Sequence, residues 1–321
     1  IGPNNINKGW DWCSGYHYSD SIVIGFSHLH LNGTGCSDTG DLLFMPYTGK
    51  VRTQPGTQDD PLSGYASYYS KSNEKALPGY YEVLLETHHI KVELTASDRV
   101  AFHRYTFPKI AEKYVMINLK DANGDDRPTD TYLEQVNDTT VRGYRCSTGW
   151  SKQQQIYFTA VFSEPVHLAL YHDSISVQGN ILQGVDVKGN IIVASDVEKL
   201  DMKVGISPVS MENAAANIQQ EIADWNFERI VGETTAKWNA ELSKLQVTTT
   251  DTVAKRIFYT ALYHAFIQPV MFNDYNKEYR GTDKNVYGDP GFTNYTVFSL
   301  WDTYRAAHPL YTLIQPGRVP D

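Results

Sequence analysis

Many short β-prone segments in the first two thirds of the chain constrain the fold more than any other feature. Between Tyr18 and about Ser207 these segments are rich in β-branched and aromatic residues, and turn pairs such as Pro78-Gly79, Gly179-Asn180 and Gly189-Asn190 separate them. They predict strands at residues 21–31, 79–86, 89–96, 100–107, 114–119, 155–162, 167–171 and 189–194. Because long helices do not alternate with these segments, a mostly antiparallel β-sandwich is favoured over a parallel α/β sheet.

The periodicity changes after Pro208. Apolar residues recur at spacings of three and four in residues 211–225 and 235–245, and again in residues 257–266 after a helix cap at Asp251. We therefore expect a β-sandwich domain at residues 1–207, a helical linker at 208–247 and the start of a second, helical domain at 248–321. The helices of this last part bury too little apolar surface to be stable alone, so we expect a partner chain to cover them or the sequence to continue.

The composition excludes several classes of protein. A net charge of −9 and a pI of about 5.6 lack the basic footprint of a nucleic-acid or membrane-surface binder. No run of about 18 apolar residues predicts a membrane-spanning helix. The three cysteines have no CxxC spacing, which supports neither a disulfide scaffold nor a zinc site. The 22 tyrosines and 6 tryptophans suit carbohydrate binding, and they also suit a large β-sandwich.

The stretch from residue 294 to 308 combines groups that suit a sugar. It predicts a helix that Ser299 caps and Pro309 limits, with Trp301 and Arg305 on one face and Asp302 within one turn of Arg305. An indole ring stacks on the apolar face of a sugar, while charged groups bind its hydroxyls. The alternative is an amphipathic helix in which Trp301 belongs to the core and Asp302 pairs with Arg305.

A glycine-rich stretch follows the first predicted strand. Gly33 and Gly35 flank Thr34 and precede Cys36, and the missing side chains let backbone amides approach a ligand closely. A phosphate-binding loop is excluded, because the stretch has no GxxxxGK[ST] pattern and no helix after it. A tight connecting loop is the alternative.

Two polar loops can each be explained as a structural turn. The acidic stretch at residues 121–130 resembles a calcium loop, but it lacks the glycine at its sixth position and the glutamate at its twelfth. Asp274 and Arg280 follow Pro269 in a loop that either binds a ligand or forms a structural turn.

Several of these stretches together resemble the family 92 glycoside hydrolases, which are calcium-dependent exo-α-mannosidases. The resemblance rests on HLNGTGCSDTGD ending at Asp41, PGYY at 78–81, VELTASDRVAFHRYTFP at 92–108, residues 259–273, and TNYTVFSLWDTYRAAHPL at 293–310. It implies a mainly β chain with an N-terminal antiparallel β-sandwich, linker helices and the first helices of an (α/α)6 barrel that is incomplete here. The active site is expected between the two domains.

The resemblance also implies a chemistry. Family enzymes invert configuration: a glutamic acid protonates the leaving oxygen, an aspartate pair activates water, and Ca²⁺ holds two mannose hydroxyls. Asp302 is expected to bind the distal hydroxyls of the terminal mannose. The other residues expected at the sugar are Gly33, Thr34, Gly35, Cys36, Trp301 and Arg305.

The acid, the base and the calcium ligands are expected beyond Asp321, so no catalytic or metal-binding residue is assigned in this sequence. The expected substrates are mannose-containing glycans such as N-glycans, and the expected compartment is the periplasm or the exterior. The alternative function is a non-catalytic carbohydrate-binding or structural β-sandwich protein.

Overall fold

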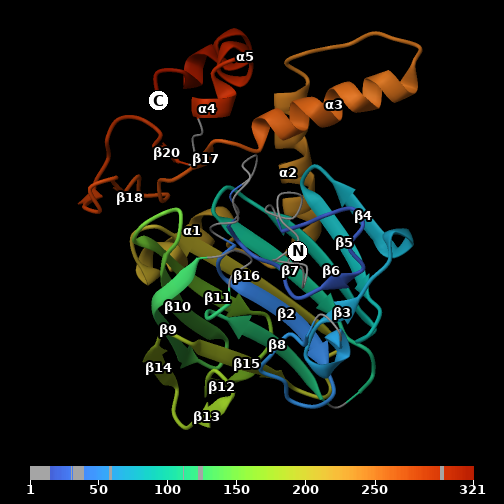
Figure 1. Cartoon of the computed structure of the whole chain (residues 1–321), viewed down its shortest axis with the longest axis vertical. Coiled ribbons are helices and arrows are strands. Elements are labelled where there is room, and N and C mark those ends of the chain that lie inside the picture. Colours follow the sequence, from blue (N-terminus) through green and yellow to red (C-terminus); the bar gives the residue numbers. More distant parts are fainter. Residues whose placement is uncertain are drawn as a thin grey trace.

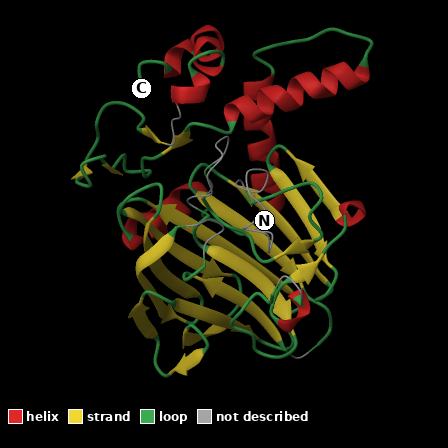
Figure 2. Cartoon of the chain, viewed as in Figure 1, coloured by secondary structure: helices red, strands yellow, loops and turns green. Residues whose placement is uncertain are grey.

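The computed structural model describes residues 15–29, 31, 40–57, 60–110, 112–121, 126–296 and 300–321, without the side chain of Asp302. Two antiparallel sheets face each other in the lower part of the molecule, and most of the helices lie at one end or on one face of them (Figures 1 and 2). This arrangement confirms the mainly β class and the N-terminal sandwich.

The larger sheet has nine strands. Their order is β14 (Ile181–Gly184), β9 (Arg127–Asn137), β10 (Thr140–Thr148), β11 (Gln154–Phe162), β16 (Lys199–Ser207), β7 (Val100–Thr106), β6 (Ile90–Ala96), β5 (Tyr80–Leu85) and β4 (Glu74–Leu77). The smaller sheet has five strands, in the order β13 (Ile175–Val177), β12 (Val166–His172), β15 (Val187–Val193), β8 (Lys113–Asn118) and β2 (Leu43–Thr48). Side chains such as Phe44, Ile117 and Phe158 fill the space between the sheets and are fully buried.

One predicted turn is a strand. Gly189 and Asn190 lie inside β15, opposite Ile117 and Met116 of β8. A Cβ atom on Gly189 would lie 2.5 Å from Leu133 Cδ2 of the facing sheet and 2.7 Å from Leu168 Cδ1. The glycine is therefore required for close packing between the sheets and not for a turn.

The long first strand predicted at residues 21–31 is also wrong. Among the described residues of this range, only β1 (Ile22–Val23) is a strand; it pairs with β3 (Ser67–Tyr68), and Phe26 makes an isolated bridge to Phe44. A Cβ atom on Gly25 would lie 2.5 Å from Leu43 Cγ, so the backbone crosses close over β2 at this point. The chain follows β2 without a continuous ladder.

Three helices follow the sandwich. α1 (Met211–Glu221) and α2 (Phe227–Leu242) begin at caps in which Ser210 accepts from the Asn213 amide and Asn226 from the Arg229 amide. α3 (Thr252–Phe266) begins at the predicted cap, Asp251. α1 therefore ends earlier, and α2 begins earlier, than the apolar spacing predicts. Together they cover part of the outer face of the nine-stranded sheet and form a second core with Val100, Phe102, Ile218, Ile222, Phe227 and Ile230.

The last segment contains two small ribbons and two helices. β17 (Val270–Met271) pairs with β20 (Tyr295–Thr296), and β18 (Tyr279–Arg280) pairs with β19 (Val286–Tyr287). α4 (Leu300–Thr303) and α5 (Ala307–Ile314) lie beyond one end of the sandwich (Figure 1). Short 3-10 turns are η2 (Pro61–Ser63), η3 (Lys71–Asn73) and η4 (Pro316–Arg318).

The single helix predicted to run up to Pro309 is wrong. The chain leaves the helical conformation after Thr303, and Pro309 lies in the first turn of α5. A proline is tolerated there because the first-turn amides have no partner within the helix. Among the described helices none combines the length and apolar character that would let it cross a bilayer.

Candidate functional site

Two of the three candidate sugar-binding residues of the C-terminal stretch, Trp301 and Arg305, are exposed. Trp301 on α4 is 87% exposed, so its indole is not part of the core in this structure. Arg305 lies in the turn after α4, where its Nε donates to the Tyr304 hydroxyl at 2.8 Å and its guanidinium lies 5.4 Å from the centre of the Tyr304 ring. Trp301 and Arg305 therefore do not share one continuous helical face, contrary to the prediction. The side chain of Asp302 lies outside the described part.

The glycine-rich candidates Gly33, Thr34, Gly35 and Cys36 lie outside the described residues. The segments on either side of them are described and are joined, because the backbone amide of His28 donates to the carbonyl of Asp41 at 3.1 Å. The base of the predicted loop is thus fixed by this backbone bond.

A buried arginine also bonds to Asp41, at the end of the glycine-rich stretch. The Arg145 side chain, on β10, is completely buried, and its Nη1 donates to Asp41 and, at 2.5 Å, to Asp126. Its Nε donates to the Leu119 carbonyl at 2.9 Å, and Gln154 donates to Asp41. Burial raises the pKa of Asp41 to about 7, although the Arg145 charge acts in the opposite direction. Asp41 therefore holds a proton more readily near neutral pH than an exposed aspartate does.

Two histidines meet at the end of the same stretch, and among the described residues no third metal ligand joins them. His28 Nε2 lies 3.0 Å from His103 Nε2, and His28 Nδ1 lies 2.8 Å from the Leu42 carbonyl. The Tyr105 hydroxyl lies 2.8 Å from His103 Nδ1. This network assigns the tautomers: Tyr105 donates to His103, His103 to His28, and His28 to the carbonyl. Burial lowers the pKa of His28 to about 4 and that of His103 well below its ordinary value, so both rings are neutral.

The loop residues Asp274 and Arg280 attach the last segment to the sandwich. Asp274 is buried and accepts from Ser207 Oγ at 2.6 Å and from Asn217 Nδ2 at 2.8 Å. Burial raises its pKa, while these donors act in the opposite direction. Arg280 Nε donates to the Pro208 carbonyl at 2.9 Å. The structural alternative therefore accounts for both residues. A cavity of about 480 Å³ lies against this junction, with Arg99 in its wall.

The described part offers no calcium site. Within it, no three or more His, Cys, Asp or Glu side chains converge to hold a metal ion. The described residues therefore provide no cluster of carboxylates for a calcium ion.

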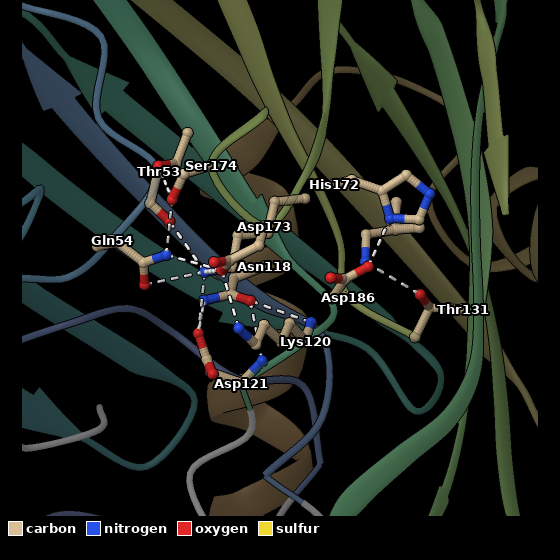
Figure 3. Close-up of polar contacts among 12 residues, drawn as sticks. Thr53, Gln54, Asn118, Lys120, Asp121, Thr131, His172, Asp173, Ser174 and Asp186 are labelled. Atoms are coloured by element: carbon tan, nitrogen blue, oxygen red, sulfur yellow. Dashed lines mark hydrogen bonds and ion pairs between the residues drawn. The ribbon is translucent and has the colours of Figure 1, made fainter. Parts of the chain in front are cut away.

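A charged cluster at the far end of the sandwich is structural. The buried Lys188 Nζ lies 3.0 Å from the Thr53 carbonyl, 3.1 Å from Asp121 and 3.3 Å from Asp173. Figure 3 shows Gln54 and Lys120 beside Asp173, and His172 bound to Asp186 nearby. The hydrogen bond from Lys120 lowers the pKa of Asp173 to about 2. These charges satisfy one another and fix the loop at residues 49–57 to β12 and β15.

Sequence reasoning did not find Arg145. The residues of β10 on the inner face of the sandwich are Val141, Gly143, Arg145 and Ser147. This pattern lacks the apolar alternation of a half-buried strand, so neither β10 nor its arginine was predicted. A charged residue at an inward position was the available signal.

Comparison with known proteins places the chain in a family. The sequence model of the glycosyl hydrolase family 92 N-terminal domain matches residues 1–207, and that of the family 92 catalytic domain matches residues 213–321. Both belong to a class of enzymes that cleave glycosidic bonds. The chain belongs to glycoside hydrolase family 92.

Solved structures of this family have the same fold. The family 92 α-mannosidase BT3965 of Bacteroides thetaiotaomicron is 36% identical and superposes with a TM-score of 0.92 over 97% of this chain and 43% of its own. The inverting family 92 mannosidase BT2199 of the same organism is 25% identical, with a TM-score of 0.82, over 97% of this chain and 41% of its own. An uncharacterized secreted glycosidase of Arthroderma benhamiae is 23% identical over 91% of this chain and 40% of its own length. The chain thus spans about two fifths of the length of these relatives.

Proposed function

We propose that this chain is part of an exo-α-mannosidase that removes terminal mannose from glycans with inversion of configuration. The observation that carries the proposal is the match to the α-mannosidase BT3965 along 97% of the chain. The same protein has been solved with mannoimidazole bound, and BT2199 is described as an inverting enzyme, which supports a mannose pocket and inversion. Inversion requires one carboxylic acid and one carboxylate far enough apart to admit water between them.

The proposed pocket is formed by the two candidate stretches. Residues 33–36 approach the terminal mannose from the sandwich, and Asp302 binds its distal hydroxyls with Trp301 and Arg305 beside it. The indole of Trp301, which is 87% exposed in this chain, is proposed to stack on the apolar face of the sugar. The acid and the base are proposed to follow Asp321 in the enzyme.

Calcium is proposed as the cofactor, with ligands outside the described residues, which hold no suitable cluster. The ion would supply a hard cation for neighbouring sugar hydroxyls. Dialysis of the longer enzyme against a calcium chelator should abolish hydrolysis, and added Ca²⁺ should restore it. Full activity after dialysis, with calcium verified absent by elemental analysis, would remove calcium from the proposal.

Hydrolysis of α-mannobioses with different linkages tests the function. The longer enzyme should release mannose as the β-anomer first, which ¹H NMR detects before mutarotation. Trp301→Ala should lower kcat/KM at least tenfold without lowering Tm, whereas Trp238→Ala, which removes a ring 4.6 Å from Tyr263, should lower Tm. The chain ending at Asp321 should not hydrolyse mannosides even with calcium; turnover by this chain, with its mass verified, would overturn the placement of the acid and base.

Secretion or a periplasmic location is part of the same proposal. The Arthroderma relative is named as a secreted glycosidase, and extracellular glycans are the substrates that such an enzyme would meet. A non-catalytic carbohydrate-binding protein is the second candidate, because Trp150 in the turn after β10 is 79% exposed. Hydrolysis by the longer enzyme decides between the two.

A further inference from the structure

One part of the sandwich surface carries aromatic side chains that no helix covers. α1 packs mainly on β16 and β11, and α2 on β6 and β5, while β9 and β14 at the other end of the nine-stranded sheet have no comparable helix contact. Figure 1 shows this end of the sheet free of helices. Leu133 of β9 points into the sandwich toward Gly189, so its neighbours Tyr132 and Glu134 point outward.

A row of tyrosines begins on this outer face and ends on β11, against which α1 packs. Tyr132 of β9 is directly opposite Tyr144 of β10, and Tyr144 is directly opposite Tyr157 of β11. The first two rings stack with their centres 5.4 Å apart and their planes 8° apart, and the second pair has centres 5.7 Å apart. Because the first two rings lie face to face, they cover each other's faces, and their edges and hydroxyl groups are presented outward in a fixed arrangement.

Polar groups suited to hydroxyl recognition adjoin the row. The Tyr144 hydroxyl donates to Asp130 Oδ2 at 2.8 Å, and Gln183 Nε2 of the edge strand β14 donates to Asp130 at 3.1 Å and to the Tyr144 hydroxyl at 3.0 Å. These bonds orient the carboxylate, the amide and the phenol relative to one another before any ligand arrives. The amide carbonyl of Gln183, which is exposed, and the remaining lone pairs of Asp130 are then available as acceptors.

The combination indicates a neutral glycan as the occupant. Sugar hydroxyls both donate and accept hydrogen bonds, which match the oriented phenol, carboxylate and amide groups. Polyanions are disfavoured, because Asp130 has no arginine or lysine bonded to it in the described part, and Arg142 is already bonded to Glu134 at 2.7 Å.

We propose that the outer face formed by Tyr132, Tyr144, Asp130 and Gln183 is a second, non-hydrolytic glycan-binding site. It holds a neutral mannose-containing oligosaccharide away from the catalytic pocket. The choice of mannose as the sugar rests on the proposed function; the existence of the site does not.

Affinity electrophoresis of the longer enzyme, kept free of calcium with a chelator, through gels containing neutral α-mannan tests the site. The wild-type protein should be retarded, and the apparent dissociation constant should rise about fivefold in Gln183→Ala and in Tyr144→Phe, since each removes one oriented hydrogen-bonding group. Tyr132→Ala should raise it further by removing a ring. Circular dichroism verifies that each variant is folded.

Two controls distinguish this site from the proposed pocket. Tyr18→Ala, which removes a tyrosine that is 75% exposed elsewhere, should leave the retardation unchanged. Trp301→Ala should also leave it unchanged, because Trp301 belongs to the other site. Three results would overturn the second site: no retardation of the wild-type protein, retardation of the face variants equal to that of the wild type, or loss of retardation with Trp301→Ala. None of these results affects the proposed function, which hydrolysis by the longer enzyme tests separately.

Discussion

At the scale of single residues, Arg145 joins two loop segments at one end of the sandwich. Its guanidinium links Asp41, which follows the glycine-rich stretch, to Asp126, which precedes β9. All three side chains are withdrawn from solvent, so each charge depends on the others for stabilisation.

Replacing Arg145 by methionine should lower the free energy of unfolding by about 3–5 kcal/mol, because two carboxyl groups would remain buried without a cation. Urea denaturation measures the loss. Arg142→Met is the matched control: it removes an arginine of the same strand whose side chain is 31% exposed, and it should cost less than about 1 kcal/mol. Equal losses in the two variants would contradict the assigned role of the buried group.

The lowered pKa of His28 predicts how the stability of the fold changes with pH. The pKa of His28 is about 4 in the folded chain, against an ordinary value of 6.5. Between these values the unfolded chain binds more protons, so the stability contribution is complete above pH 6.5 and is lost as the pH falls toward 4. The loss should be at most about 3 kcal/mol.

Chemical denaturation at pH 7, 5.5 and 4.5 measures this dependence. His28→Phe, which keeps a ring beside Phe44 but cannot titrate, should reduce the slope of stability against pH in this range. A slope identical to that of the wild-type chain would show that other groups cause the acid dependence.

At the scale of elements, close packing between the sheets depends on a glycine inside a strand. Gly189→Ala should lower the free energy of unfolding by about 1–3 kcal/mol, because the new Cβ atom would lie 2.5 Å from Leu133 Cδ2. Gly232→Ala on α2 is the control: nothing lies within 4 Å of its Cβ position, so helix propensity should raise stability by about 0.5–1 kcal/mol. Thermal unfolding with both variants checks the opposite signs.

The elements also show where sequence patterns suffice. Strands β5, β6, β7, β8, β11, β12 and β15 lie within a residue or two of the predicted segments, because enrichment in β-branched and aromatic residues between turn signals is a local property of the sequence. The helix expected to run from Ser299 to Pro309 is divided, since a proline is compatible both with the end of one helix and with the first turn of the next. Only the packing of the folded chain selects between these two positions of the proline.

At the scale of the whole molecule, the last segment depends on a few buried polar contacts with the sandwich. Asp274 accepts from Ser207 of β16 and from Asn213 and Asn217 of α1. Asp274→Ala would leave these buried donors without their acceptor and should release the loop at residues 274–292.

Limited trypsin digestion measures this release at Lys277, Arg280 and Lys284. Cleavage there should become about tenfold faster in Asp274→Ala, while the sandwich stays resistant. Asp289→Ala, which breaks an exposed 2.8 Å ion pair with Lys277, is the control and should have a much smaller effect. Unchanged cleavage in Asp274→Ala would contradict the role of the buried carboxyl group.

The sequence alone determined the class of this protein. Its β-prone segments, the later helical spacing and the glycine-rich and SLWDTYR stretches predicted a sandwich followed by helices and the glycoside hydrolase family, because each of these signals lies within a short stretch of chain. Only the tertiary structure decided that Arg145 joins Asp41 to Asp126, that Gly189 allows the two sheets to pack closely, and that Tyr132 and Tyr144 stack on one surface. These features arise between residues that meet only in the folded chain, so no local pattern contains them.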